Sequence, residues 1–246
     1  MSRAFIRDIS VPLRPHGFPV WPGDATPVFR LSSSHERGDG VDVTQLALSA
    51  HTGTHLDAPR HFVAGAGLVT GLDLRALMGP AHVVHYAGSG LLDAAFFAAQ
   101  HLPDPCPRVL LRCDKNAGRL EQSVFFEDYA AITPEAADWL VARGCRLIGT
   151  DYLSIGSFHA GNREVHVTLL GAGVIIVEGL DLRGVEPGEH TLICLPPPLP
   201  CDGAPCRAVL LPSGALPDPL LGEEETAAAT DDVDPAPGGP AVPTSF

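Results

Sequence analysis

The sequence predicts an α/β domain built around a mixed β-sheet, and three observations lead to this prediction. Apolar segments of strand length recur between turn residues, helical signals are fewer, and many connections are too short to hold a helix. Apolar residues make up 45% of the 246 residues and charged residues 18%, so the chain can bury a sizeable core. A fully doubly wound fold, which needs helices in its crossovers, is therefore not expected.

Seven apolar runs bounded by turn residues are the candidate strands. They cover residues 41–50, 81–87, 107–113, 145–150, 174–178, 191–196 and 207–211. In the first run, Val41, Val43 and Leu46 come close to alternating with polar residues, which is typical of a half-buried strand.

The clearest helix begins after Thr133 and ends before Gly144. Thr133 is a good N-cap, Pro134 suits the first helical position, and Gly144 suits the residue after the last turn. Further helices are expected at residues 91–101 and 164–171, with a short piece near 73–78.

Composition divides the chain into a globular domain, residues 1–215, and a tail, residues 216–246. The tail consists mainly of Pro, Ala, Gly and acidic residues, which is the composition of a disordered segment. No Lys or Arg follows Arg207 but seven acidic residues do, so about half of the formal net charge of −13 lies there. The remaining body is mildly acidic, which argues against nucleic-acid binding.

The N-terminal sequence and the cysteines predict a cytoplasmic protein. The first residues, MSRAFIRDISVPL, contain no apolar signal-peptide core, and no stretch is long and apolar enough for a membrane span. None of the six cysteines forms a CxxC pair, so we expect reduced thiols, most of them buried.

The segment His51-Thr-Gly-Thr-His55-Leu-Asp57-Ala-Pro-Arg-His61 carries the strongest chemical signal. If its backbone is extended, the three histidines and Asp57 lie at even offsets and project from one face. Imidazole nitrogen and carboxylate oxygen suit zinc or manganese, and three protein ligands leave positions open for water. Pro59 would end the extended run, so we expect His61 to turn toward the substrate as a proton shuttle. A lone histidine on a strand is usually structural, but this spacing is hard to obtain by chance.

Two more polar residues stand where ligands often bind. His166 lies near the start of an expected helix, and Glu178 ends the apolar run 174–177. A polar residue at the end of a buried strand commonly lies at the rim where ligands bind. Taken alone, either residue is also compatible with a purely structural role.

Several linked motifs resemble the cyclase family, which includes bacterial kynurenine formamidases and isatin hydrolases. HTGTHLDAPRHF is similar to the family signature HxGTHxDxPxH. The resemblance extends over most of residues 5–211, and its other motifs occur in the family's order. They are Trp21-Pro22-Gly23-Asp24, Gly149-Thr150-Asp151-Tyr152-Leu153-Ser154-Ile155, His166 with Leu169-Leu170, Glu178-Gly179-Leu180, and the run from Asp202 to Val209.

The resemblance implies a swivelling β/β/α fold and a metal centre of one or two Zn²⁺ or Mn²⁺ ions. It assigns one ion to His51, His55 and Asp57. Asp57 would bridge to a second ion, held also by His166 and Glu178.

The resemblance also implies roles for two further residues and an oligomeric state. His61 would be the general acid and base, and Trp21 would stack on the aryl ring of a small-molecule substrate. Core packing is an alternative role for Trp21. Family members usually form dimers, so a homodimer is expected.

The chain departs from the family pattern near the expected second metal ligands. Gly156 stands where the family usually has Asp, and the segment 156–164 carries the additional His159. The loop after His61 and the C-terminal tail also have their own composition. These departures bear on the identity of the substrate more than on the binding of the metal.

The sequence therefore predicts a metal-dependent amide hydrolase, with an arylformamidase that cleaves N-formylkynurenine to kynurenine and formate as the first hypothesis. An isatin-type lactam hydrolase and a cyclase or lactone hydrolase of specialised metabolism are alternatives within the family. A non-catalytic, metal-stabilised binding protein is the alternative from another class. The chain has no complete GxGxxG loop, no P-loop and no GxSxG nucleophile elbow.

Overall fold

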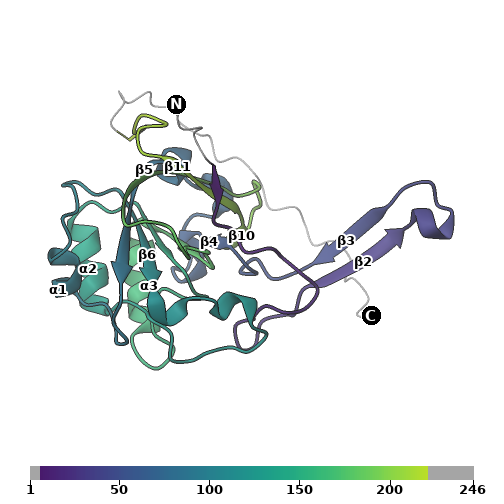
Figure 1. The fold of residues 1–246 in the computed structure, drawn as a ribbon, viewed down its shortest axis with the longest axis horizontal. Coiled ribbons are helices and arrows are strands. Elements are labelled where there is room, and N and C mark those ends of the chain that lie inside the picture. The colour runs from purple at the N-terminus through teal and green to yellow at the C-terminus, as the bar shows by residue number, and fades with distance from the viewer. Residues whose placement is uncertain (1–5, 221–246) are drawn as a thin grey trace.

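The computed structural model describes residues 6–220, and within them most strands form one large mixed sheet (Figure 1). Its strand order is β1-β11-β9-β5-β6-β7-β8-β4-β10, and β2 and β3 form a separate hairpin. The strands are β1 (Arg7–Asp8), β2 (Val28–Ser33), β3 (Val43–Ala47), β4 (His55–Asp57), β5 (Met78–Tyr86), β6 (Arg108–Cys113), β7 (Leu147–Thr150), β8 (Ile175–Glu178), β9 (Gly188–Leu195), β10 (Gly203–Pro205) and β11 (Arg207–Pro212). The α-helices are α1 (Ala94–Ala98), α2 (Pro134–Ala142) and α3 (Asn162–Gly171). Short 3₁₀ helices are η1 (His35–Arg37), η2 (Pro59–His61), η3 (Val69–Gly71), η4 (Leu74–Leu77), η5 (Asp114–Asn116) and η6 (Arg119–Glu121).

The centre of the sheet consists of the parallel strands β5, β6, β7 and β8, which lie side by side in chain order. Right-handed crossovers between such neighbours put all the connecting helices on one face, where α1, α2 and α3 are found (Figure 1). Residues along a strand alternate between the faces, so Val109 and Leu111 pack toward the helices while Leu110 belongs to the core on the other side.

Antiparallel strands flank this centre and curl the sheet around its second core. β9, β11 and β1 continue it beyond β5, while β4 and β10 continue it beyond β8. A bridge between Ser10 and Leu180 joins the chain after β1 to the chain after β8. Ile9 and Leu56 are completely buried in the core that this curl encloses. The prediction of an α/β fold with a mixed sheet is confirmed.

Each of the seven predicted runs overlaps a strand, and the four predicted helical segments overlap α2, α1, α3 and η4. The predicted cap of α2 is present, since Thr133 Oγ1 accepts a hydrogen bond from the Ala136 amide at 3.2 Å. The prediction missed β1, β2 and β10, whereas β4 lies within the segment 51–61 that was expected to be extended. β1 and β10 have two and three residues, too few to show a periodic pattern.

The expectation of a half-buried strand at 41–50 was wrong in one respect. β3 pairs only with β2, and the hairpin extends away from the body of the molecule (Figure 1). All five residues of β3 are exposed, with Val43 at 45% and Leu46 at 58%. Alternation gives a strand two different faces, but it does not supply a layer that covers one of them.

The folded part of the chain reaches beyond the expected boundary at residue 215. Asp218 accepts hydrogen bonds from both terminal nitrogens of Arg108, at 3.1 and 3.2 Å, and Arg108 is completely buried. The predicted tail from residue 221 onward lies outside the described residues. The six cysteines are free thiols, four of them buried. No helix within residues 6–220 has the length and hydropathy needed to cross a membrane.

Candidate metal centre

The centre of the candidate site is the pairing of β4 with β8. His55 lies directly opposite Glu178 in the antiparallel register, and directly opposed residues project from the same face. Asp57, two residues along β4, shares that face. His55 Nε2 lies 3.4 Å from Glu178 Oε2 and 3.6 Å from Asp57 Oδ1. All three residues are buried.

The backbone before and after β4 is not extended, which corrects the basis of the sequence prediction. Residues 51–54 form a turn in which Gly53 has φ +69°, and residues 59–61 form η2. A side chain at Gly53 would also collide with Leu13. The histidines at 51 and 61 therefore approach Asp57 from a turn and a 3₁₀ helix rather than from one strand face.

His166 enters the site from α3, on the helix-covered side of the sheet. Its Nδ1–H donates to the carbonyl of Asn162, one helical turn earlier, at 2.8 Å. This bond leaves Nε2 to face the carboxylates, 3.4 Å from Glu178 Oε1 and 3.9 Å from Asp57 Oδ2. The Phe62 ring stacks on the His166 ring with centroids 4.3 Å apart.

His51 and His61 form the outer side of the site. Their rings lie 3.9 Å apart between centroids, with planes 32° apart. His51 Nδ1 lies 2.9 Å from Asp57 Oδ1. Both histidines also contact Asp202, which sequence reasoning placed in a family motif but gave no role. The structure thus brings together the predicted residues His51, His55, Asp57, His61, His166 and Glu178.

Unsatisfied atoms at the centre fit a bound cation. Within residues 6–220 four buried side-chain polar atoms lack a hydrogen-bond partner, and His55 Nε2 and Asp57 Oδ2 are two of them. The Nδ1–H of His55 donates to the carbonyl of Gly53 at 3.0 Å, so its Nε2 carries the lone pair when the ring is neutral. Buried polar atoms without partners are rare, so two of them in one cluster of imidazoles and carboxylates fit a site that holds a cation.

Within residues 6–220, two groups of three side chains each have ligand atoms that lie within 4.8 Å of one another. Asp57 belongs to both groups, which are His51 with Asp57 and His61, and His55 with Asp57 and Glu178. A carboxylate shared between two groups would bridge two ions, but these groups differ from the expected ligand sets. His61 joins the first group in place of His55, and His55 joins the second in place of His166. Imidazole nitrogen and carboxylate oxygen suit zinc or manganese.

The electrostatics agree with a site that takes a cation. Burial lowers the pKa of His51, but the hydrogen bonds and charges of Asp57 and then Asp202 outweigh it and raise the pKa to about 9. Burial likewise lowers the pKa of His55 and of His166. The neighbouring carboxylate of Glu178 acts in the opposite direction, and both pKa values are raised above the usual value. Burial alone would raise the pKa of Glu178, and the two histidines lower it far below its usual range. The protons on the histidines thus balance the negative charge of the carboxylates. A divalent cation would balance that charge in their place.

A cavity of about 240 Å³ opens on this cluster. Trp21 lines it and packs edge-to-face against Phe125 and Phe158, with centroid distances of 5.2 and 5.5 Å. Its other lining residues are Phe18, Pro19, Val20, Asp24, Thr52, Gly53, Phe62, Leu153, Ser154, Asn162 and the cluster itself, apart from Asp57. The cavity is therefore lined by both aromatic side chains and ionisable groups.

Asn162 takes the space next to Gly156, where the family pattern has Asp. A Cβ atom at Gly156 would lie 2.5 Å from Asn162 Oδ1 and 2.9 Å from Asn162 Cα. Asn162 Oδ1 accepts a hydrogen bond from Ser154 Oγ at 3.1 Å. Gly156 itself does not line the cavity, but Asn162, which fills the space beside it, does.

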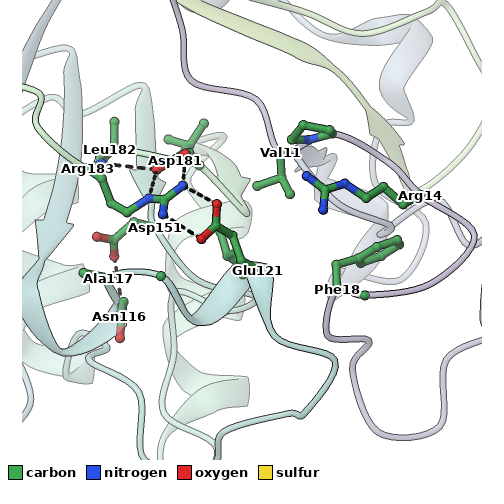
Figure 2. Close-up of a pocket in the computed structure, with 15 residues that line it drawn as sticks. Val11, Arg14, Phe18, Asn116, Ala117, Glu121, Asp151, Asp181, Leu182 and Arg183 are labelled. Carbon is green, nitrogen blue, oxygen red and sulfur yellow. Dashed lines mark hydrogen bonds and ion pairs between the residues drawn. The ribbon is translucent and has the colours of Figure 1, made fainter.

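A second, smaller cavity of about 40 Å³ lies between the N-terminal segment and the loop after β8, and Figure 2 shows its lining. The guanidinium of Arg183 is held by Asp181 and by Glu121. The carboxylate of Asp151 accepts hydrogen bonds from the side chain of Asn116 and the amide of Cys113. These charged groups already have partners within the protein, so we assign the chemistry to the larger cavity.

Comparisons with known proteins agree with this fold. The model of the family described as "Putative cyclase" matches residues 7–157, which include the segment from His51 to His61. A predicted metal-dependent hydrolase from Bacillus stearothermophilus is similar at 26% identity and a TM-score of 0.72, over 85% of this chain and 99% of that chain. Isatin hydrolase A from Labrenzia aggregata, bound to benzyl benzoate, is similar at 23% identity and a TM-score of 0.73, over 85% and 94% of the two chains. An isatin hydrolase bound to the product analogue thioisatinate is similar at 21% identity and a TM-score of 0.74, over 84% and 91%.

Proposed function

The chain belongs to the cyclase family, and on that premise we propose that it is a metal-dependent hydrolase that cleaves the C–N bond of an aryl formamide. The proposed reaction converts N-formylkynurenine and water to kynurenine and formate. The observation that carries the proposal is the pair of unsatisfied buried atoms in the cluster, Asp57 Oδ2 and the Nε2 of His55, a residue that lines the same cavity as His61 and Trp21.

We assign the metal ligands as the resemblance implies. His51, His55 and Asp57 would hold one ion, and Asp57, His166 and Glu178 a second, with zinc or manganese as the metal. When bound, such an ion polarises the amide carbonyl and lowers the pKa of a water molecule.

The side chains around the cavity provide the remaining steps. His61 removes a proton from the attacking water and delivers it to the aniline nitrogen as the C–N bond breaks, so that the amine leaves uncharged. The indole of Trp21, held by Phe125 and Phe158, offers an apolar face for the aryl ring. Phe62, which stacks on His166, keeps water from that side of the cluster.

An isatin-type lactam is the second candidate substrate. The similar structures include isatin hydrolases, and isatin carries its amide nitrogen on an aryl ring, as an aryl formamide does. The same metal centre and aromatic wall would serve both reactions. A cyclase or lactone hydrolase, and a metal-stabilised binding protein, remain the alternatives.

The purified protein, stripped of metal and then supplied with zinc or manganese, tests the proposal. Hydrolysis of N-formylkynurenine is followed by kynurenine absorbance, with isatin assayed beside it. We expect turnover that needs the metal and falls at least about 100-fold in His61→Ala. His101→Ala, a change at an exposed histidine outside the cavity, is the matched control.

Three outcomes distinguish the candidate substrates and the two possible roles of His61. Turnover of isatin alone would assign the lactam, while turnover of neither substrate with stoichiometric metal bound would contradict both. A metal affinity that falls with His61→Ala would make His61 a ligand rather than the proton shuttle. The homodimer that the resemblance implies is measured separately by sedimentation velocity.

A further inference from the structure

Asp202 holds the two outer histidines of the candidate site with a single oxygen atom. Its Oδ2 lies 3.0 Å from His51 Nε2 and 3.1 Å from His61 Nδ1. In the sequence, Asp202 lies 151 positions after His51 and 141 positions after His61. Asp202 therefore stands between the side chain assigned to the metal and the side chain assigned to proton transfer.

The fold fixes Asp202 in this place. It immediately precedes β10, and its carbonyl accepts a hydrogen bond from the Ala58 amide at 2.9 Å, so its backbone is tied to the segment after β4. The next residue, Gly203, pairs with Asp57 in the β4–β10 register. A Cβ atom at Gly203 would lie 2.5 Å from His51 Cε1, so a glycine there leaves room for the His51 ring.

The donor and acceptor capacities of these groups show which ring nitrogens carry hydrogens. A carboxylate oxygen only accepts hydrogen bonds, so each ring nitrogen that faces Asp202 must carry a hydrogen. His51 then has Nε2–H. Its Nδ1 lies 2.9 Å from a second carboxylate, Asp57, so without an ion it also carries a hydrogen in the charged ring, and it is this Nδ1 hydrogen that a bound ion would replace. His61 has Nδ1–H, which leaves the lone pair of its neutral form on Nε2.

We propose that Asp202 is a positioning residue that sets the tautomers of both His51 and His61 for metal binding and proton transfer. The inference rests on the proposed function, since it assumes that His51 binds the ion and that His61 moves the proton. A histidine that binds metal through one nitrogen commonly donates its other N–H to a carboxylate, which orients the ring and makes it a better ligand. Here one carboxylate serves two rings.

The experiment uses ¹⁵N-labelled protein with zinc as the probe. Two-bond ¹H–¹⁵N correlation spectra report which ring nitrogen carries the hydrogen, for His61 with and without zinc and for His51 with zinc. In the unchanged protein we expect Nδ1–H on His61 and Nε2–H on His51. In Asp202→Ala we expect His61 to lose this single tautomer and zinc affinity to fall about 10- to 100-fold.

Two further variants separate positioning from folding. Asp202→Asn keeps an acceptor oxygen without the charge, so it should retain the His61 tautomer and restore part of the zinc affinity. Asp114→Ala removes the carboxylate from the remote pair of Asp114 Oδ1 and His85 Nε2, 2.7 Å apart, and should leave zinc affinity unchanged. Because the Asp202 side chain is 43% exposed, its replacement should not unfold the chain.

The outcomes distinguish failure of the inference from failure of the proposed function. Unchanged tautomers and zinc affinity within about twofold in Asp202→Ala would overturn the role of Asp202, whether or not the protein hydrolyses an amide. If the unchanged protein binds zinc but turns over neither N-formylkynurenine nor isatin, the proposed function fails, and the spectra still decide the role of Asp202. If turnover is present, kcat should fall in Asp202→Ala by at least tenfold with a smaller change in KM.

Discussion

His55 and Glu178 face each other across β4 and β8, and His55 Nε2 lies 3.4 Å from Glu178 Oε2. The two residues are 123 positions apart, so the sheet register brings them together. This pairing puts a carboxylate next to an imidazole nitrogen that has no hydrogen-bond partner.

Glu178→Gln keeps the shape of the side chain and removes its charge. If Glu178 is a ligand, zinc or manganese affinity should fall at least 100-fold, more than the loss expected for a residue that only supports a ligand. Isothermal titration calorimetry measures it directly. Glu127→Gln, at an exposed position, is the matched control and should bind as the unchanged protein does. Affinity within a few-fold of the unchanged protein would remove Glu178 from the ligand set.

The raised pKa of His51 predicts opposite pH trends for metal affinity and for stability of the metal-free protein. A group whose pKa is higher in the folded protein than its ordinary 6.5 stabilises the fold fully below that value, and the contribution is lost as the pH rises through about 9. The shift corresponds to on the order of 3 kcal/mol. Thermal unfolding with chelator should therefore show stability falling between pH 6.5 and 9.

Metal binding should respond in the other direction, because a ligand nitrogen must lose its proton. Apparent zinc affinity should rise with pH up to about 9, and calorimetry in buffers of different ionisation enthalpy should detect proton release. His51→Gln should flatten the stability trend, whereas His85→Gln, at a histidine outside the cluster, should not. A metal-free protein that gains stability over this range contradicts the assignment.

The sequence predicted the set of residues in the site better than it predicted how they meet. The spacing from His51 to His61 suggested one extended strand, but only His55–Asp57 is a strand. Gly53 bends the chain before it, and η2 turns it afterwards. Even spacing places side chains on one face only while the backbone stays extended, so the right residues were found from the wrong geometry.

The sequence pattern could not predict contacts between segments that are distant in the chain. Asp202 belongs to a motif that could be recognised, yet nothing local shows that its carboxylate meets His51 and His61. In the same way, the alternation around Val43 is equally compatible with an exposed hairpin and with a covered strand. Periodicity records which residues share a face, whereas the contacts of that face depend on the whole topology.

Trp21 should control the affinity for aryl substrates. Trp21→Ala removes the apolar face at the wall of the cavity, and we expect KM for N-formylkynurenine to rise about tenfold with a smaller change in kcat. Trp21→Phe should retain much of the affinity because it keeps an aromatic ring between Phe125 and Phe158. Trp139→Leu, in α2 and outside the cavity, should leave KM unchanged. An unaltered KM in Trp21→Ala would leave Trp21 with a packing role only.

The buried guanidinium of Arg108 predicts that the domain needs residues beyond 215. Arg108 donates to the carbonyls of Ala76 and Pro80 as well as to Asp218, whose side chain is only 10% exposed. Removing one partner of a buried ion pair costs about 3–5 kcal/mol, because the other charge stays buried without compensation. Asp218→Ala should therefore lower the denaturant midpoint strongly with little change in slope.

Chain length provides an independent test of the same contact. A chain that ends after Ala215 should show the instability of Asp218→Ala, whereas one that ends after Leu220 should match the full chain. Asp104→Ala is the matched control, because it removes an exposed carboxylate, 67% accessible, from its pair with Arg143. Such surface pairs contribute little, so its midpoint should hardly move. Equal midpoints for the two shortened chains would mean that Asp218 does not stabilise Arg108 and would return the domain boundary to residue 215.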